Sequence, residues 1–220
     1  STLFPYTTLF RSLMTRILLS RDLKKIEDIE LKQIKKLIRS FQILEESYNK
    51  DIYKANIKIF YNGVEVKKFL GKKNIPFSQP ESITALFYPI LFINGEIQNF
   101  NENFFYKHWT EVAIKNEIIN FILPIEDLED ISKIVEMKNR IEELNIKTFI
   151  NKYDVENYVF VLMDYHDEKL SIQLKTNFNN NRTSKNISHE VKNINDQLVL
   201  NFILKDLKLK ITDLWKEENL

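Results

Sequence analysis

The sequence predicts an α+β or α/β protein, with a small helix-plus-hairpin unit followed by an α/β domain that has a mixed sheet and a C-terminal helix. Its 220 residues are 44% hydrophobic and 29% charged, with a formal net charge of +1, which is typical of a folded globular chain. Strand and helix patterns alternate along its middle. The sign of the charge changes near Pro76 and Pro80, which indicates a boundary between two units.

The two expected units differ in charge. Residues 13–75 carry 15 basic and 8 acidic side chains, a net charge of +7, whereas residues 76–165 carry 7 basic and 15 acidic side chains, a net charge of −8. We therefore expect a basic α+β unit over 13–75 and an acidic α/β domain over 76–220.

Residues 1–12 read STLFPYTTLFRS, which matches the translation of a common sequencing-library adapter. This stretch is rich in Thr, Leu and Phe, whereas Ile, Lys and Asn dominate the rest of the chain. We expect it to be an artefact, with the natural N-terminus and any signal peptide missing, so that Met14 need not be the start. A genuine amphipathic N-terminus is the alternative.

In the basic unit, an amphipathic helix is expected from apolar residues at helical spacing between Leu31 and Phe41. Two strands are expected over 41–49 and 52–62, joined around Asn49, Lys50 and Asp51, and then a short helix over 64–73. The opposite side of the first helix carries the candidate interaction surface for anionic lipid or nucleic acid: Lys32, Lys35, Lys36 and Arg39. A solvated face is the favoured interpretation, so nucleic acid is not the expected partner.

In the acidic unit, strands are expected at 83–93, 118–125 and 157–165, and helices near 105–116, 127–138 and 142–153. This alternation favours a parallel core. His166, Asp167 and Glu168 then form a hairpin turn, because apolar and polar residues alternate strictly over 170–178 and leave one face of that strand exposed to water. An edge strand over 186–193 and a core-facing helix over 200–215 complete the unit.

Several classes of site are excluded by composition. The chain has no Cys, three His and three Gly, so it can form no disulfide, Walker loop or dinucleotide-binding fingerprint. We expect no cofactor and no metal site. The longest apolar run, Ile83–Ile93, is too short for the roughly 20 residues that cross a bilayer, so no transmembrane segment is expected.

One acidic cluster is the candidate catalytic site. Glu126, Asp127 and Asp130 follow an apolar strand, and Asp164 ends another. Because ligands bind at the carboxyl ends of parallel strands, these carboxylates could act as acid and base or hold a divalent cation. The favoured alternative is that Asp127 caps the next helix while Glu129 and Asp130 complement the positive end of the helix dipole.

Aromatic residues between 100 and 109 could form a recognition surface. However, Phe105 and Trp109 are four residues apart, which places them on one helical face and favours packing in the core. His108 is expected at the margin of that face.

Several of these segments resemble the bacterial family named domain of unknown function 2066. The similar segments are Ile43–Tyr48 with Tyr53–Phe60, Val64–Ile75, Leu86–Ile90, Leu123–Ile131 and Tyr153–Leu162. Asn103 and Trp109 match a family pattern, Asn-Pro-Trp-x-x-x-Trp, in which Phe104 and Phe105 here replace the proline and the first tryptophan. Glu126 replaces a glycine of the family's Pro-Leu-Gly-Asp segment. These replacements are compatible with packing.

The resemblance implies an exported protein of the cell envelope with no established enzymatic activity, and it carries over no catalytic residue. We therefore expect a periplasmic or envelope-associated binding or assembly module that meets a protein partner at the exposed sheet edge near 169–193 and at the crevice by Asp127. Whether it is an enzyme stays open, because a cation-dependent hydrolase using Glu126, Asp127, Asp130 and Asp164 is one alternative. A cytoplasmic anion or RNA binder that uses the basic helix is another.

Overall fold

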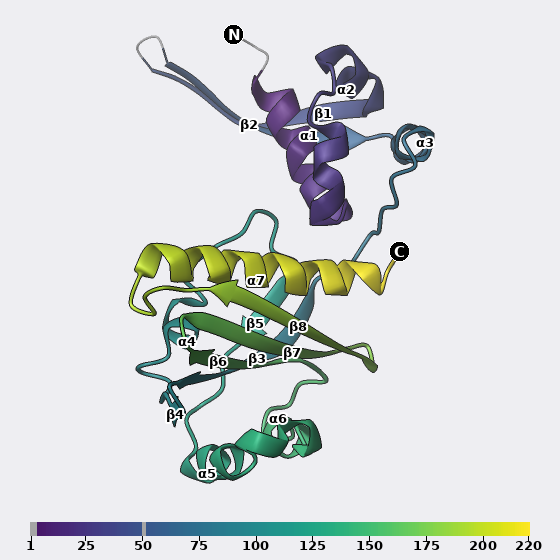
Figure 1. Cartoon of the computed structure of the whole chain (residues 1–220). Helices are drawn as coiled ribbons and strands as arrows, with labels where there is room; N and C mark the ends of the chain where they lie inside the picture. Colours follow the sequence, from purple (N-terminus) through teal and green to yellow (C-terminus); the bar gives the residue numbers. More distant parts are fainter. Residues whose placement is uncertain (1–3, 50–51) are drawn as a thin grey trace. The chain divides into compact units, whose positions relative to one another are not determined.

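The computed structural model describes residues 4–49 and 52–220, which divide into two compact units (Figure 1). The first unit runs to Pro80 and includes Asn219 and Leu220, and the second spans Glu81–Glu218. The division therefore falls at the second proline of the segment where the charge changes sign. The expected turn residues Lys50 and Asp51 lie outside the described residues.

The first unit combines helices with one long hairpin. Strands β1 and β2 pair in antiparallel fashion, and Ile34, Leu37, Val66 and Leu70 from α2 and α3 lie in the hydrophobic core of the unit. The elements are α1 (Phe4–Ile17), the 3-10 helix η1 (Ser20–Ile26), α2 (Leu31–Leu37), β1 (Ile38–Asn49), β2 (Ile52–Tyr61) and α3 (Gly63–Lys72).

The first expected helix is shorter than its pattern suggested. Helix α2 ends at Leu37, and Ile38 already has the extended backbone of β1 (φ −83°, ψ 127°). Phe41 therefore lies in a strand opposite Ile59, and its side chain is 55% exposed. Pairing with β2 overrides the helical spacing, because β-branched and aromatic residues favour strands wherever a partner strand is available.

Helix α1 includes residues 4–12 of the adapter-like segment. Phe10 and Met14 are fully buried, and they lie in the same core cluster as Ile34 and Leu70. The origin of residues 1–12 stays a prediction, but within this chain Phe10 is a core residue.

The second unit is built on a mixed six-stranded sheet of order β4-β3-β6-β7-β8, in which β5 pairs with β3 as well. Strand β3 is parallel to β5 and β6, and the other pairs are antiparallel. This confirms the expected mixed sheet with a parallel core. The strands are β3 (Ile83–Ile93), β4 (Glu96–Ile97), β5 (Ile119–Ile122), β6 (Asn157–His166), β7 (Lys169–Phe178) and β8 (Asn181–Glu190).

Helices cover both faces of this sheet (Figure 1). Helix α7 lies over one face, where Val159, Val161 and Met163 of β6 belong to the core, and the alternate residues Tyr158 and Phe160 face a second cluster with residues of α5 and α6. The helices are α4 (Phe104–His108), α5 (Leu128–Glu136), the 3-10 helix η2 (Lys138–Glu143), α6 (Lys147–Ile150) and α7 (Gln197–Glu217). No helix within the described ranges is long and apolar enough to cross a membrane.

Several elements are shorter than expected. The helix expected near 105–116 ends at His108, the strand expected over 118–125 ends at Ile122, and the helix expected over 142–153 is reduced to η2 and the four residues of α6. Pro124 follows β5 closely, and proline cannot continue a strand ladder. The edge strand begins at Asn181 rather than 186, because Asn179 and Asn180 form a tight turn in which both residues have positive φ.

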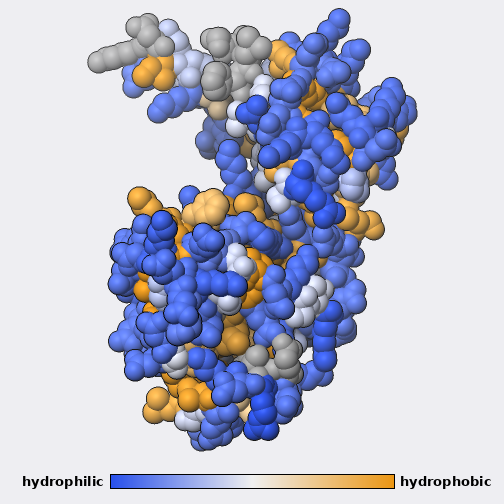
Figure 2. All heavy atoms as spheres, in the orientation of Figure 1, coloured by the Kyte–Doolittle hydropathy of each residue, from blue (hydrophilic) through white to orange (hydrophobic). Residues whose placement is uncertain are grey.

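Strand β7 has the expected wet face. Leu170, Ile172 and Leu174 are buried beneath α7, whereas Ser171 is exposed and Gln173 is half-buried on the other face. Asn177, which the alternation also places on the wet face, is buried, and its side-chain amide donates a hydrogen bond to the Glu156 carbonyl. The turn before it uses Asp167 and Glu168 at positive φ, as two-residue hairpins require. The surface visible in Figure 2 is largely hydrophilic.

Candidate functional site

Asp127 begins helix α5. Its Oδ1 accepts hydrogen bonds from the backbone N–H groups of Glu129 at 2.9 Å and Asp130 at 3.4 Å. This confirms the helix-cap interpretation, since a side-chain oxygen at this position satisfies two of the four N–H groups that a helix start leaves unpaired.

Lys152 joins the two aspartates of the cluster. Its Nζ lies 2.5 Å from Asp127 Oδ2 and 2.8 Å from Asp130 Oδ1. Asp130 is only 1% exposed, and its other oxygen, Oδ2, accepts a hydrogen bond of 3.4 Å from the Tyr88 hydroxyl. One lysine, from beyond α6, thus neutralises a carboxylate that the fold buries. Nothing in the local pattern around residue 127 points to a lysine 25 positions later, so only the structure identifies it.

These contacts shift the pKa values of Asp127, Lys152 and Tyr88. The hydrogen bond from Lys152, together with the two backbone N–H groups, lowers the pKa of Asp127 below its ordinary value of 3.8. The two carboxylates raise the pKa of Lys152, and burial followed by the charge of Asp130 raises the pKa of Tyr88. A general acid at neutral pH needs a carboxyl pKa that is raised, so the shift at Asp127 runs opposite to that requirement.

The structure does not bring Asp164 to this cluster. Asp164 pairs with Phe92 in the β3–β6 ladder, four positions along from the pair Tyr88 and Phe160, which is a separation of about 13 Å along the strands. Its carboxylate lies 3.6 Å from Lys138 Nζ. Glu126 is exposed at the start of the cluster. Among the described residues, no group of three or more His, Asp and Glu could hold a metal ion.

Replacing Lys152 with methionine is expected to lower the urea midpoint of the second unit at neutral pH, because Asp130 would remain buried without its cation. The lowered pKa of Asp127 means that its stabilising contribution is present above pH 3.8 and is lost as the pH falls through the folded-state value. The difference between wild type and Lys152→Met should therefore shrink in acid. Lys133→Met, an exposed change on α5, is the control, and an undiminished difference at low pH would contradict this account.

The candidate basic surface is split between two elements. Lys32, Lys35 and Lys36 are exposed on α2, but Arg39 lies in β1, so the four cations do not share one helix face as expected. Lys35 Nζ lies 5.9 Å from the centre of the Tyr6 ring, a cation–π contact within the unit.

The aromatic segment packs in the core, as the spacing indicated. Phe105 and Trp109 are fully buried, and the Trp109 ring stacks on Phe87 with centroids 3.4 Å apart. Asn103 accepts hydrogen bonds from the first turn of α4 and donates to the Pro89 carbonyl. His108 lies at the margin, 2.6 Å from Glu111.

Strand β8 forms one edge of the sheet. Its ladder with β7 runs over ten residue pairs, from Lys169↔Glu190 to Phe178↔Asn181, without a register shift, and the strand contains no proline. Within residues 4–49 and 52–220, no strand pairs with its outer side. Proteins usually protect such an edge with a bulge, a proline, a short strand or charged side chains, and β8 has only the last of these, in Arg182, Lys185 and Glu190. The outer edge of β8 is therefore a regular template of backbone groups.

No family model matches the chain, so the resemblance to domain of unknown function 2066 stays a prediction, and no curated protein matches either. Among solved structures, the lipoprotein GNA1162 from Neisseria meningitidis is similar, with a TM-score of 0.32 and 10% identity over 59% of this chain and 96% of that one. A likeness of this size carries no argument about function.

Proposed function

We propose that this protein is a non-catalytic binding or assembly module of the bacterial cell envelope, and that an extended segment of a protein partner adds to the outer edge of β8. The regular edge of β8, which has no bulge and no proline, is the observation that carries the proposal. Strand addition uses backbone N–H and C=O groups for affinity and side chains on alternate positions for specificity. Ser188 and Asn186 supply exposed polar side chains for the second role.

The carboxylate cluster supports binding over catalysis. Asp127 caps helix α5 and pairs with Lys152, and Asp130 contacts Lys152 and Tyr88. These contacts account for both aspartates by folding alone. The envelope location rests on the family resemblance.

Two single proline substitutions on β8 test the proposed strand addition. Adjacent residues of an antiparallel strand direct their N–H groups alternately to the two sides, so one of Lys185→Pro and Asn186→Pro removes a bond to β7 and the other removes an outward donor. The outward variant should keep the melting temperature closer to wild type and still lose the partner.

The readout is photo-crosslinking in bacterial cells, with a benzophenone amino acid at Ser188 on β8 or at the exposed Val135 on α5. We expect a discrete protein adduct from position 188, none from 135, loss of the adduct in the outward proline variant, and its retention in Asp127→Asn with Asp164→Asn. An adduct that survives both prolines would refute strand addition. A folded double Asn variant that loses a measured activity completely would favour the hydrolase alternative.

The location is tested by reading the gene upstream of Leu13 in an independent clone. A charged start, an apolar stretch and a small-residue cleavage site would support export to the envelope. A frame that opens at Met14 would place the protein in the cytoplasm and remove the main content of the resemblance.

A further inference from the structure

The hairpin of β1 and β2 is exposed along most of its length. The two strands form a sheet of their own, with no third strand among the described residues, and Figure 1 shows the outer part of the hairpin beyond the helices of the first unit. Every residue of β1 from Arg39 to Asn49 is exposed to solvent. An isolated two-stranded hairpin is at best marginally stable in water, so this element is expected to have a partner surface.

The register of the hairpin collects its apolar side chains on one face. Directly paired residues of an antiparallel ladder lie on the same face, and alternate residues of one strand return to it. By this rule, one face is formed by Phe41, Ile43, Glu46 and Tyr48 of β1 with Tyr53, Ala55, Ile57 and Ile59 of β2. We call it the apolar ribbon face. The opposite face carries Lys54, Asn56 and Lys58 of β2.

A β-bulge extends this face toward the outer part of the hairpin. Leu44 is the extra residue, at which the register of β1 against β2 shifts by one position. Without it, the alternation along β1 would place Ser47 opposite Tyr53. The bulge instead pairs Tyr48 with Tyr53, so that two aromatic side chains lie side by side on the apolar ribbon face.

The aromatic side chains of the apolar ribbon face are open to solvent. Tyr48 is 74% exposed, Tyr53 57% and Phe41 55%. A fully buried aromatic side chain accounts for about 150–250 Å², so these three rings and the isoleucines beside them leave on the order of 500 Å² of apolar surface open in each copy of the chain. Two such faces packed together would bury about 1,000 Å², the area at which specific protein interfaces begin.

The charge of this face favours a second copy of the chain over a lipid surface. Glu46 is the one charged side chain that the described register places on it, and its Oε2 accepts a hydrogen bond of 2.8 Å from the Tyr53 hydroxyl. Surfaces that bind anionic lipid carry Lys or Arg next to their apolar residues. The lysines of β2, Lys54 and Lys58, lie on the opposite face of the hairpin.

We propose that a second copy of the chain packs on the apolar ribbon face, with the two hairpins face to face about a two-fold axis. Sheets packed in this way lie about 10 Å apart, and an interface of this symmetry presents the same residues from both copies. The proposal does not depend on strand addition, because the hairpin belongs to the first unit and the β8 edge to the second. Each proposal can therefore fail without the other.

Sedimentation velocity of the whole chain over a range of concentrations tests the association, and we expect a reversible equilibrium between monomer and dimer. Tyr48→Ser should raise the dissociation constant at least about tenfold, because the symmetry places this ring in the interface twice. Lys54→Ser is the matched control, at an exposed position on the opposite face of the same hairpin, and should leave the constant unchanged. Glu46→Gln should lower the constant, because dimerisation would no longer bury a carboxylate.

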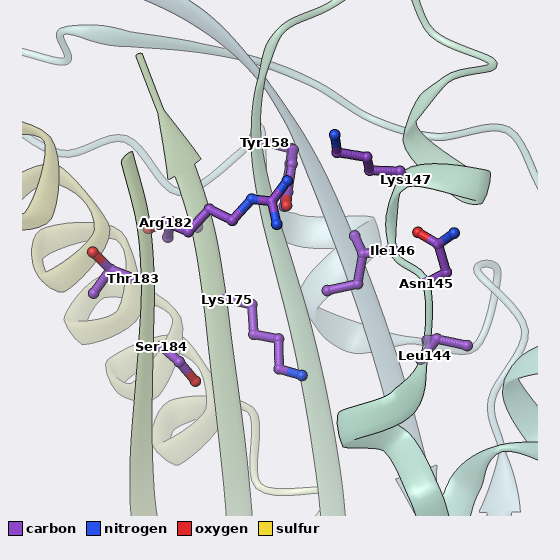
Figure 3. Close-up of a pocket in the computed structure, with 10 residues that line it drawn as sticks. Leu144, Asn145, Ile146, Lys147, Tyr158, Lys175, Arg182, Thr183 and Ser184 are labelled. Atoms are coloured by element: carbon purple, nitrogen blue, oxygen red, sulfur yellow. The ribbon is translucent and has the colours of Figure 1, made fainter. Parts of the chain in front are cut away.

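Crosslinking through single cysteines locates the contact, since the chain has no cysteine of its own. A bis-maleimide with a span of about 10 Å, the spacing of packed sheets, should join two copies of Ala55→Cys on the apolar ribbon face. It should not join two copies of Asn56→Cys, on the opposite face of the hairpin. Ser184→Cys is the control in the second unit, at an exposed residue that lines the pocket shown in Figure 3, and it should not crosslink either.

Several results would overturn the proposal. They are a chain that stays monomeric at every concentration, an equal loss of association in Lys54→Ser and Tyr48→Ser, weaker association in Glu46→Gln, and equal crosslinking from positions 55 and 56. A monomeric chain that co-sediments with phosphatidylglycerol vesicles would assign the face to a lipid surface instead. Because Tyr48 is exposed, Tyr48→Ser should keep the melting temperature of the monomer close to that of wild type.

Discussion

Replacing Trp109 with alanine is expected to lower the free energy of unfolding of the second unit by about 4 kcal/mol, the range for large-to-small changes of a fully buried aromatic residue. Trp109 stacks on Phe87 and meets the edge of Phe121 at 5.1 Å between centroids. Lys208 Nζ, from α7, lies 5.0 Å from the centre of the same ring. The variant therefore loses contacts with two strands and one helix at once.

Urea unfolding followed by the fluorescence of Trp215, the other tryptophan of the chain, measures this loss. Trp109→Phe is the conservative variant. It keeps a stacked ring, leaves a smaller cavity and removes an N–H that has no acceptor among the described residues, so we expect a clearly smaller cost than for Trp109→Ala. Phe202→Ala, at a position that is 67% exposed on α7, should cost less than about 0.5 kcal/mol. A Trp109→Ala protein of unchanged stability would revive the recognition-surface interpretation.

Replacing Phe10 with alanine is expected to destabilise the first unit by about 3 kcal/mol, because the side chain is fully buried and the cavity would lie at the centre of a small core. Its ring lies 6.3 Å from Phe69 of α3 and 6.5 Å from Tyr61 of β2, between centroids. One residue of the adapter-like segment thus connects α1 to two other elements of the unit.

Backbone hydrogen exchange is the appropriate measurement, since both tryptophans lie in the second unit. Amides of α1, α2 and α3 should exchange faster in Phe10→Ala, while those of β3 and β6 should keep their rates. Phe41→Ala, at an exposed position of β1, is the control and should leave both sets unchanged. Unchanged exchange in Phe10→Ala would show that α1 adds nothing to the core, as expected of a segment foreign to the protein.

The sequence predicted those elements whose pattern is both strong and local. Strand β3 has the expected bounds, because its apolar run from Ile83 to Ile93 is buried on both faces and ends at polar residues. The alternation in β7 identified its two faces correctly as far as Lys175, since a strand exposes alternate residues to opposite sides. The cap at Asp127 followed in the same way from residues within one helical turn.

The sequence predicted the structure less well where the outcome depends on a residue far away in the chain. Phe41 fits the helical spacing of its own segment, yet it lies in β1, because the decision depends on Ile59, which pairs with it from another strand. The expected catalytic group failed to assemble for a related reason. The carboxyl ends of the parallel strands were expected to lie close together at one edge of the sheet. The register of β3 and β6 instead separates Asp164 from Asp127 and Asp130.

The sequence by itself determined the elements with the strongest patterns, such as β3, β7 and α7, and the mixed character of the sheet, because helix and strand periods are properties of adjacent residues. Only the tertiary structure decided that Lys152 neutralises Asp127 and Asp130, that β8 is an edge, and that Tyr48 and Tyr53 share one exposed face of the hairpin. Each of these depends on strand register or on contacts between residues far apart in the chain. Such contacts leave no periodic trace, since their partners are chosen by packing in three dimensions rather than by spacing.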